Sequence, residues 1–440
     1  MGDVEEIVHT LVQEQDDQLA QFGLLPDDLF GPNDSANLSL DLSSALANRP
    51  YESSAANGNR LTSCISSHPS GNISKDTEQT VQGLSQLTAN ERQAVSAERY
   101  INAYYLNYRP AHPFIHEMTF RDTYATHGLS AHSLTWSILV NAVIAIGSWC
   151  LKETNSEIDM EYYLRAKELL EQVSLMEPGN LSLIQGLLLL HDFSQKRGMP
   201  ETGLHYLSAA SRMAINIGLH KEDPNHTTTP FESEMRRWVW WSIYIYDSCA
   251  AKNFGVPILL PENKFITTKS VLNIHDEAFD PLAASVPSEI NGVTIYSGLI
   301  FQAKFHLTAN NIYRRLISTP NISIPEVQEM EKLIDAWHDS LPPYLKQPNS
   351  PADSETMNIT KDRLRICDKN LRILLWKPFL FKRPLNESSG HHFIDSKNDL
   401  HKECAFRCLF TAKESMSLVL QSIRRRQPNR PVASFLLYAP

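Results

Sequence analysis

Residues 229–261 read TPFESEMRRWVWWSIYIYDSCAAKNFGVPILLP, and this stretch decides the fold class. Its beginning has the pattern of a capped helix: Thr229 is a good N-cap, Pro230 fits the first turn, and Glu232 stands where a capping box needs a carboxylate. Aromatic and aliphatic side chains then recur at helical spacing through to about Asn253. Gly255, followed by two prolines, forbids one continuous helix beyond that point. Because the bulky rings point all round the axis, we expect a helix that is buried inside a helical domain.

Two charged features of the same helix need an explanation. Arg236 and Arg237 precede the aromatic block WVWW at 238–241, and interleaved Arg and aromatic side chains can stack on nucleic-acid bases. Rings on every side of a helix are more typical of core packing, so we expect Trp238 and Trp241 to fill the space between helices. Asp247 lies on an otherwise apolar helix and must be partnered if buried, and Arg237 or a loop amide is the expected neighbour.

Apolar periodicity predicts further helices on both sides of this one. The expected ranges are 91–108, 131–151, 157–176, 180–196 and 201–217 before it, and 294–318, 325–340, 361–381 and 399–425 after it. Gly218 is placed for a left-handed C-terminal cap. The stretch AHPFIHEMTF at 111–120 is expected to be irregular. We find no useful run of alternating β-branched residues, so the sequence predicts a large all-α domain of antiparallel-packed helices.

One apolar stretch, LTWSILVNAVIAIGSWCL at 134–151, is long enough to raise the question of a membrane span. It contains Thr, Ser and Asn, and no belt of basic anchors flanks it. We therefore interpret it as a buried core helix and predict no membrane association.

Charge is distributed unevenly along the chain. Residues 1–48 contain ten acidic side chains and no Lys or Arg, so this segment carries a formal charge of −10. The net charge of all 440 residues is also −10. Residues 1–30 mix these acids with bulky apolar side chains, as disordered activation segments do, although a solvated tail has the same composition. Residues 31–88 are rich in Ser, Asn and Gly and are predicted to be a disordered linker. The all-α domain is expected to occupy 89–440.

The common catalytic patterns are mostly absent from the sequence. The sequence has no phosphate loop, no dinucleotide fingerprint and no G-x-S-x-G elbow, and His116-Glu117 lacks the second histidine of a helical zinc site. The acidic stretch from His275 to Asp280 is the nearest match to an aspartate-rich magnesium motif. It stands among prolines, and we expect it to be a solvated acidic turn. No catalytic or cofactor-binding residue is assigned.

Two further groups could bind ligands. His401, Cys404 and Cys408 stand about one helical turn apart, but no fourth metal ligand is evident and free cysteines are commonly buried apolar residues, so no metal site is assigned. The basic run at 424–426, with Arg430, could contact phosphates or an import receptor. A solvated helix end with favourable cations is the more ordinary interpretation.

Four blocks in order resemble the middle homology region of fungal zinc-cluster transcription factors. They are the aromatic helix and HPFIHEMTF within 100–124, LLLLHDFSQKRGMPETGLHYLSAASRMAINIGLH at 187–220, the Arg-Arg, Trp-Trp, Asp and Gly-x-Pro pattern at 236–261, and RILLWKPFLFKRP at 372–384. The resemblance implies an all-α regulatory domain that contacts proteins or an effector, in the nucleus.

The chain departs from that family at its N-terminus. The family's DNA-binding module needs six closely spaced thiolates, whereas residues 1–90 hold one cysteine, Cys64, in an acidic context. The sequence stops at Pro440, shortly after ASFLLYA, where the family usually continues with further helix. We expect either a short regulator or a chain that lacks the ends of the full protein.

The sequence thus favours a transcriptional regulator that is not an enzyme and carries no DNA-binding motif of its own. Its expected partners are a co-regulator or a second chain, with a small-molecule effector as a further expectation. Two other readings stay open: an all-α enzyme of secondary metabolism, which a cavity lined by carboxylates or histidines would support, and a helical scaffold without an effector. No internal period of 30–45 residues supports a repeat array.

Overall fold

The computed structural model describes residues 97–129, 133–151, 157–174, 177–222, 228–319, 321–380 and 396–425. Within these ranges the regular elements are helices and no residue is assigned to a strand, which confirms the all-α prediction. All of them fall in the compact unit that begins at Ala97. The expected acidic segment 1–30 and linker 31–88 lie outside the described residues.

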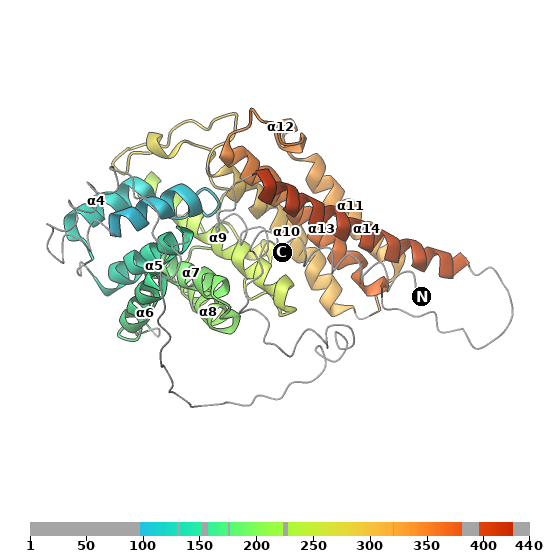
Figure 1. The fold of residues 1–440 in the computed structure, drawn as a ribbon, viewed down its shortest axis with the longest axis horizontal. Helices are drawn as coiled ribbons and strands as arrows, with labels where there is room; N and C mark the ends of the chain where they lie inside the picture. Colours follow the sequence, from blue (N-terminus) through green and yellow to red (C-terminus); the bar gives the residue numbers. More distant parts are fainter. Residues whose placement is uncertain are drawn as a thin grey trace, which may run out of the picture. The chain divides into compact units, whose positions relative to one another are not determined.

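The first group of helices precedes the aromatic helix in the sequence (Figure 1). Helical residues 97–103 continue into a π-helical stretch, η1. The elements are η1 (Tyr104–Tyr108), α4 (Glu117–His127), α5 (Leu134–Cys150), α6 (Ile158–Leu170), α7 (Leu181–Lys196) and α8 (Pro200–Asn216). Helices α5 and α6 pack together, as do α7 and α8, and α5 also packs on α7.

The second group begins with the aromatic helix. Its elements are α9 (Pro230–Phe254), η2 (Asn263–Phe265), η3 (Asp276–Ala278), α10 (Ser297–Ser318), α11 (Ile324–Asp339), α12 (Pro343–Lys346), α13 (Glu355–Trp376), η4 (Lys377–Phe379) and α14 (Ser396–Arg425). Helices α10, α11, α13 and α14 run beside one another, and α9 joins them to the first group through its contacts with α8 and α10 (Figure 1).

The predicted helix ends of α8 and α9 are confirmed in detail. The Thr229 side chain accepts from the backbone N–H of Glu232, and the Glu232 carboxylate accepts from the N–H of Thr229, which completes the capping box. Gly218 has a φ of 74°, and the N–H of Leu219 reaches back to the carbonyl of Ala214, as a left-handed cap requires. Gly255 is also left-handed, with a φ of 66°.

The prediction for 111–120 is wrong in its second half. Helix α4 begins at Glu117, inside the stretch expected to be irregular, because the ring of His116 accepts the N–H of Thr119 as a cap. Histidine is not among the usual capping residues, so no start signal for this helix could be recognised in the sequence. The short helix α12 was also missed, α6 ends at Leu170 rather than 176, and α13 begins at Glu355 rather than 361.

The apolar stretch at 134–151 forms α5, and almost its whole length is buried in the protein. Among the described residues, no helix is both long and apolar enough to cross a membrane. The interpretation of this stretch as a core helix is therefore confirmed.

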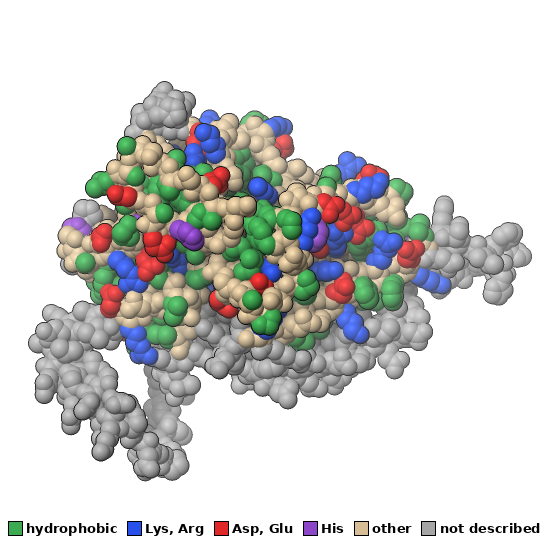
Figure 2. Space-filling model, turned by 90° about the horizontal axis from the view of Figure 1, so that it is seen from above, with side chains coloured by type: hydrophobic (Ala, Val, Ile, Leu, Met, Phe, Trp, Pro, Cys, Tyr) green, Lys and Arg blue, Asp and Glu red, His purple; other side chains and the backbone are tan. Residues whose placement is uncertain are grey.

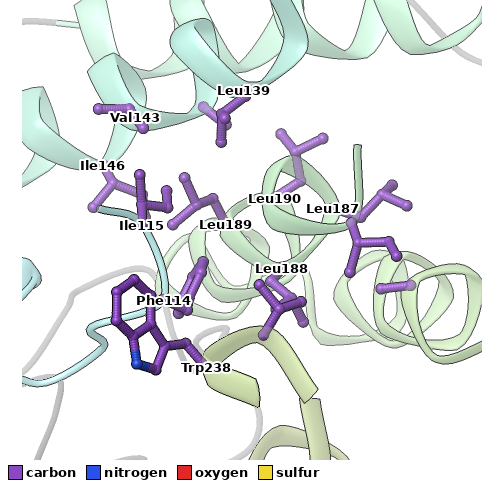
Figure 3. Close-up of a cluster of buried hydrophobic side chains, with 14 of the residues drawn as sticks. Phe114, Ile115, Leu139, Val143, Ile146, Leu187, Leu188, Leu189, Leu190 and Trp238 are labelled. Atoms are coloured by element: carbon purple, nitrogen blue, oxygen red, sulfur yellow. The ribbon is translucent and has the colours of Figure 1, made fainter. Parts of the chain in front are cut away.

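The larger of two hydrophobic cores lies among α5, α7 and α9 (Figure 3). Leu189 of α7 points towards Leu139 and Ile146 of α5, whereas Leu188 lies on the side of Trp238. Phe114 and Ile115 enter the cluster from the irregular segment before α4. Trp238 of α9 is fully buried at the edge of this cluster. The predicted core role of Trp238 and Trp241 is confirmed, since both are buried.

The smaller core lies among α10, α11, α13 and α14. Phe305 on α10 packs edge-on against Trp337 of α11, with ring centroids 4.8 Å apart. Trp376 at the end of α13 is also fully buried. Helix α10 contributes Ala303 to the first core and Phe305 to the second, so it is the element that the two cores share.

Candidate functional site

A group of buried polar side chains lies where α9, α10 and α13 meet. Ser248 and Lys252 stand one turn apart on α9, and His306 and Asn310 stand one turn apart on α10. The Ser248 Oγ lies 2.7 Å from the Nδ1 of His306 and also contacts the Oδ1 of Asn310 and the Nζ of Lys252. We call these four residues the polar centre. Three of them, all except Lys252, are fully buried.

Counting protons fixes the roles within the polar centre. The Ser248 hydroxyl has one proton, and the amide oxygen of Asn310 can only accept, so the hydroxyl donates to Asn310. The Ser248 oxygen then accepts from the Lys252 ammonium and from an N–H on the Nδ1 of His306. This tautomer leaves the Nε2 of His306 as an acceptor, 3.7 Å from the Cys249 thiol.

The Ser248–His306 contact therefore differs from a nucleophile and its base. A general base must accept the serine proton, whereas here the ring nitrogen donates to the serine oxygen. Burial lowers the pKa of His306 well below its usual range, and the neighbouring Lys252 and Arg363 charges lower it further. A neutral, fully buried ring in this arrangement braces α9 against α10.

Two thiols beside the polar centre are held in their protonated form. Burial raises the pKa of Cys249 to about 11 and that of Cys367, on α13, to about 12. A reactive cysteine needs the opposite shift, because the thiolate is the nucleophile. These thiols act as small apolar groups with a weak donor.

Lys252 is the unusual member of the group. Burial disfavours its ammonium and lowers its pKa to about 8. Among the described residues it makes no ion pair with a carboxylate. It donates to Ser248, whereas the Nδ1 of His306, 3.4 Å away, already carries a proton and does not accept from it. Since an ammonium has three protons to donate, the described part of the chain satisfies it incompletely.

A cavity of about 170 Å³ opens beside Lys252. Phe305 of α10 lines one side. The other lining residues come from the end of α9 and from α13 and η4, namely Lys252, Asn253, Cys367, Asn370, Leu371, Ile373, Leu374 and Lys377. The lining combines two lysines and two amides with aliphatic and aromatic surface, and it includes neither a carboxylate nor a histidine. The lining pattern that would support the enzyme reading is absent from this cavity.

Buried carboxylates of α9 hold the long segment that follows the helix. The Asp247 carboxylate, 3% exposed, accepts the backbone N–H groups of Leu259 at 3.2 Å and Leu260 at 2.9 Å. The expected loop amide is thus its partner, and Arg237 is not. Burial raises the pKa of Asp247, while the two amides act in the opposite direction.

Arg237 instead joins two acids. Its guanidinium contacts Glu222 and Glu234 at 2.8 Å each, and Glu234 is fully buried. Glu222 and Glu234 also accept backbone N–H groups, from Lys269 and Leu272 respectively. Arg237 therefore fastens the segment after α9 to the helix rather than facing a nucleic acid.

Arg236 has a comparable structural role. It donates to the carbonyl of Ile217 at the end of α8, at 2.9 Å. Trp240, like Trp238, is fully buried, so the rings do not form an exposed stacking platform. The expectation of core packing for this Arg and aromatic block is confirmed.

The expectation of a solvated acidic turn at His275–Asp280 is wrong for Asp276. Its carboxylate is 8% exposed and lies 2.5 Å from Arg109, with the Tyr296 hydroxyl as a further partner. Asp280 fits the expectation of a solvated acidic turn, because it is exposed. Its side chain accepts the backbone N–H of Leu282. Sequence could not reveal the Asp276 pair, because Arg109 stands 167 positions earlier in the chain.

The remaining candidate groups also have structural contacts. Cys404 and Cys408 are buried, His401 packs on Phe379, and no cluster of metal ligands is found among the described residues. Arg425 lies 3.4 Å from the buried Asp362. The side chain of Arg424 and residues 426 and 430 lie outside the described part.

The fold and the polar centre define an all-α domain in which buried polar side chains join neighbouring helices. Residues 101–339 match the fungal specific transcription factor domain. Because this match covers more than half of the chain, the chain belongs to that family, as the four sequence blocks indicated.

Several curated proteins are similar to the chain. The lactose regulatory protein of Kluyveromyces lactis is 28% identical over 310 residues, covering 68% of this chain and 33% of that protein. Activator of stress genes 1 of Saccharomyces cerevisiae is 27% identical over 226 residues, covering 50% and 23%. An ABC-transporter-regulating transcription factor of Aspergillus fumigatus is 25% identical over 262 residues, covering 54% and 27%.

The matched part thus amounts to about a third or less of the length of these relatives. No solved structure matches the chain. The relatives carry names of regulators and activators, and none of the three is named as an enzyme.

Neither the polar centre nor the cavity was predicted from the sequence. One signal was present: Ser248 and Lys252 stand four positions apart on a helix that is rich in aromatic and aliphatic residues. Polar residues at that spacing share a face, so a buried polar contact could have been expected there. The residues of α10 and α13 that lie against this face could not be predicted from the sequence.

Proposed function

We propose that the chain is a transcriptional regulator that acts in the nucleus through contacts of its helical domain with proteins or an effector. Membership of the fungal specific transcription factor domain family carries this proposal. The regulatory names of its relatives support it.

DNA contact by these helices is not part of the proposal. Arg236 and Arg237, the cations next to the aromatic block, are engaged with a helix end and with two acids. On the face shown in Figure 2, Lys and Arg side chains are interspersed with Asp and Glu, which does not create the single-sign field that attracts a phosphate backbone. We propose that a partner supplies the DNA contacts.

The acidic segment 1–30 is proposed as the part that contacts the transcription machinery. Acids interleaved with Leu19, Phe22 and Leu25 fit a segment that folds against a hydrophobic groove of a coactivator. Residues 31–88 would then connect it to the helical domain.

A tethering experiment tests the regulatory role. The full chain is fused to an unrelated DNA-binding domain in a fungal cell, and expression of a reporter with the matching operator is measured. We expect the reporter to change at least several-fold, and replacing Leu19, Phe22 and Leu25 by Ala should reduce an activating effect. A reporter that responds no more than to the DNA-binding domain alone would refute the regulatory role.

A binding assay tests the proposal that a partner supplies the DNA contacts. The purified chain is titrated with random duplex DNA at low and at physiological salt. We expect no salt-sensitive binding. Tight binding that weakens with a steep dependence on salt would show that the chain contacts phosphates itself.

A further inference from the structure

The cavity between α9, α10 and α13 has an amphipathic lining that indicates the chemistry of an occupant. Lys252 and Lys377 supply two cations, and Asn253 and Asn370 supply amide groups. Phe305, Leu371 and Cys367, all buried, supply apolar surface. Because no carboxylate belongs to the lining, the two positive charges are not neutralised within the cavity.

We propose that this cavity binds a small organic carboxylate, with Lys252 holding the carboxylate and the apolar side chains of α10 and α13 covering its carbon chain. Lys377 and Asn253 are exposed and stand at the rim, where they attract the anion. A role of the bound carboxylate in regulating transcription rests on the proposed function. Binding of the carboxylate to the cavity does not depend on that function.

Lys252 is suited to this role because its other contacts leave it short of acceptors. The Ser248 oxygen takes one of its three protons, and Ser248 is itself saturated by His306 and Asn310. A carboxylate at the ammonium would supply two strong acceptors in a place where water is partly excluded, and such charge-assisted hydrogen bonds are stronger than neutral ones. The polar centre holds the lysine in position through its hydrogen bond to Ser248.

The volume limits the size of the ligand. A closed apolar cavity of about 150 Å³ accommodates a benzene molecule, so 170 Å³ suits an acid with about six to eight non-hydrogen atoms. Longer chains would have to extend past the half-buried Ile373 and Leu374 to the rim. For so small a ligand we expect a Kd on the order of 1 mM.

Protonation gives the site a pH dependence. Burial lowers the pKa of Lys252 to about 8, and a bound anion would favour the charged amine. Asp247 on α9, Arg363 and Asp368 on α13 and Lys377 on η4 are the other charged groups that act on this region. His306 is neutral near pH 7 because burial lowers its pKa. Affinity for the carboxylate should therefore fall as pH rises above about 8.

The test is a titration of the purified full chain with butyrate, in which binding is monitored by ligand-observed NMR. Butanol serves as the uncharged analogue and inorganic phosphate as the anion without a carbon chain. We expect saturable butyrate binding and at least ten-fold weaker binding of both other probes. Equal binding of butanol would refute the role of the lysine, and equal binding of phosphate would refute the role of the apolar lining.

Variants test the location of the site. Lys252→Met should weaken butyrate binding at least ten-fold, Lys377→Met should weaken it less, and Leu374→Trp should block the cavity while both cations remain. Lys332→Met is the matched control, since Lys332 is exposed on α11 and pairs with Glu329. Thermal unfolding checks that each variant folds. Unchanged affinity in Lys252→Met, or in a folded Leu374→Trp variant, would overturn the proposal whatever the reporter experiment shows.

Discussion

The carboxylate of Asp247 lies 2.9 Å from the backbone nitrogen of Leu260, thirteen positions further along the chain. It also accepts the N–H of Leu259, so a single side chain of α9 satisfies two successive amides of the segment that leaves the helix. This segment then returns beside α9, where Glu234 and Glu222 accept the amides of Leu272 and Lys269. Acids on or near α9, of which Asp247 and Glu234 are buried, thus fix a long and mostly irregular stretch to the core.

Removing the Asp247 carboxylate should lower the free energy of unfolding. Asp247→Ala leaves the buried N–H of Leu260 without its acceptor, and we expect a loss of about 2–3 kcal/mol, measured by urea denaturation. Asp280→Ala is the matched control, because Asp280 also accepts a backbone amide but is exposed. A loss that is no greater at Asp247 than at Asp280 would contradict the role given to this carboxylate.

Removing Arg237 should be more damaging than removing an exposed arginine. Arg237→Ala leaves the fully buried Glu234 without its cation, and we expect a loss of about 3–5 kcal/mol in chemical denaturation. Arg315→Ala breaks the exposed pair with Glu326 and should cost much less, because solvent screens such a pair. Comparable losses for the two variants would show that the Glu234 pair is not buried as described.

Gly147 of α5 marks a close approach of two helical segments. A Cβ at this position would lie 1.9 Å from the carbonyl oxygen of Tyr100, so Gly147→Ala must force backbone apart. We expect a loss of at least about 3 kcal/mol, or failure to fold, as judged from the melting temperature and soluble yield. At Gly292 the nearest atom to an added Cβ is 3.8 Å away, and Gly292→Ala should be nearly neutral. If Gly147→Ala melts like the parent chain, these segments do not touch as described.

Lys252 should make stability depend on pH in a defined window. Its folded pKa of about 8 lies below its usual value of 10.5, so between these values the unfolded chain holds a proton that the folded chain lacks. The contribution of Lys252 to stability must then rise with pH through that window, and its burial cost is fully felt below pH 8. We expect Lys252→Met to be more stable than the parent near pH 7, with a difference that shrinks towards pH 10. A difference in unfolding free energy that stays constant with pH would disprove the shift.

Chelation should leave the fold of the C-terminal helices unchanged. Burial raises the pKa of Cys404, and it raises that of Cys408 to about 11, which opposes the thiolate that zinc requires. Excess EDTA is therefore expected to leave the melting temperature unaltered. A decrease that added zinc reverses would instead assign a metal to the group of His401, Cys404 and Cys408.

Patterns that repeat over short distances were readable from the sequence. The capping box at Thr229, the left-handed glycines at 218 and 255, and the buried aromatic face of α9 follow from neighbouring residues alone. The need of a buried Asp247 for a partner could be stated for the same reason, because an isolated buried acid is costly. The choice between Arg237 and a loop amide could not be made from the sequence. Helix α4 escaped prediction because its cap is an unusual residue, His116.

What the sequence by itself determined is the helical class, most helix ends and the family of this domain. Only the tertiary structure decided which buried polar side chains contact one another. Ser248 meets His306 across 58 positions, and Arg109 meets Asp276 across 167, through packing of helices that no local pattern orients. The cavity has the same origin, since α9, α10 and α13 each contribute a side. Helix formation depends on neighbours in sequence, whereas a site between helices depends on how their faces pack.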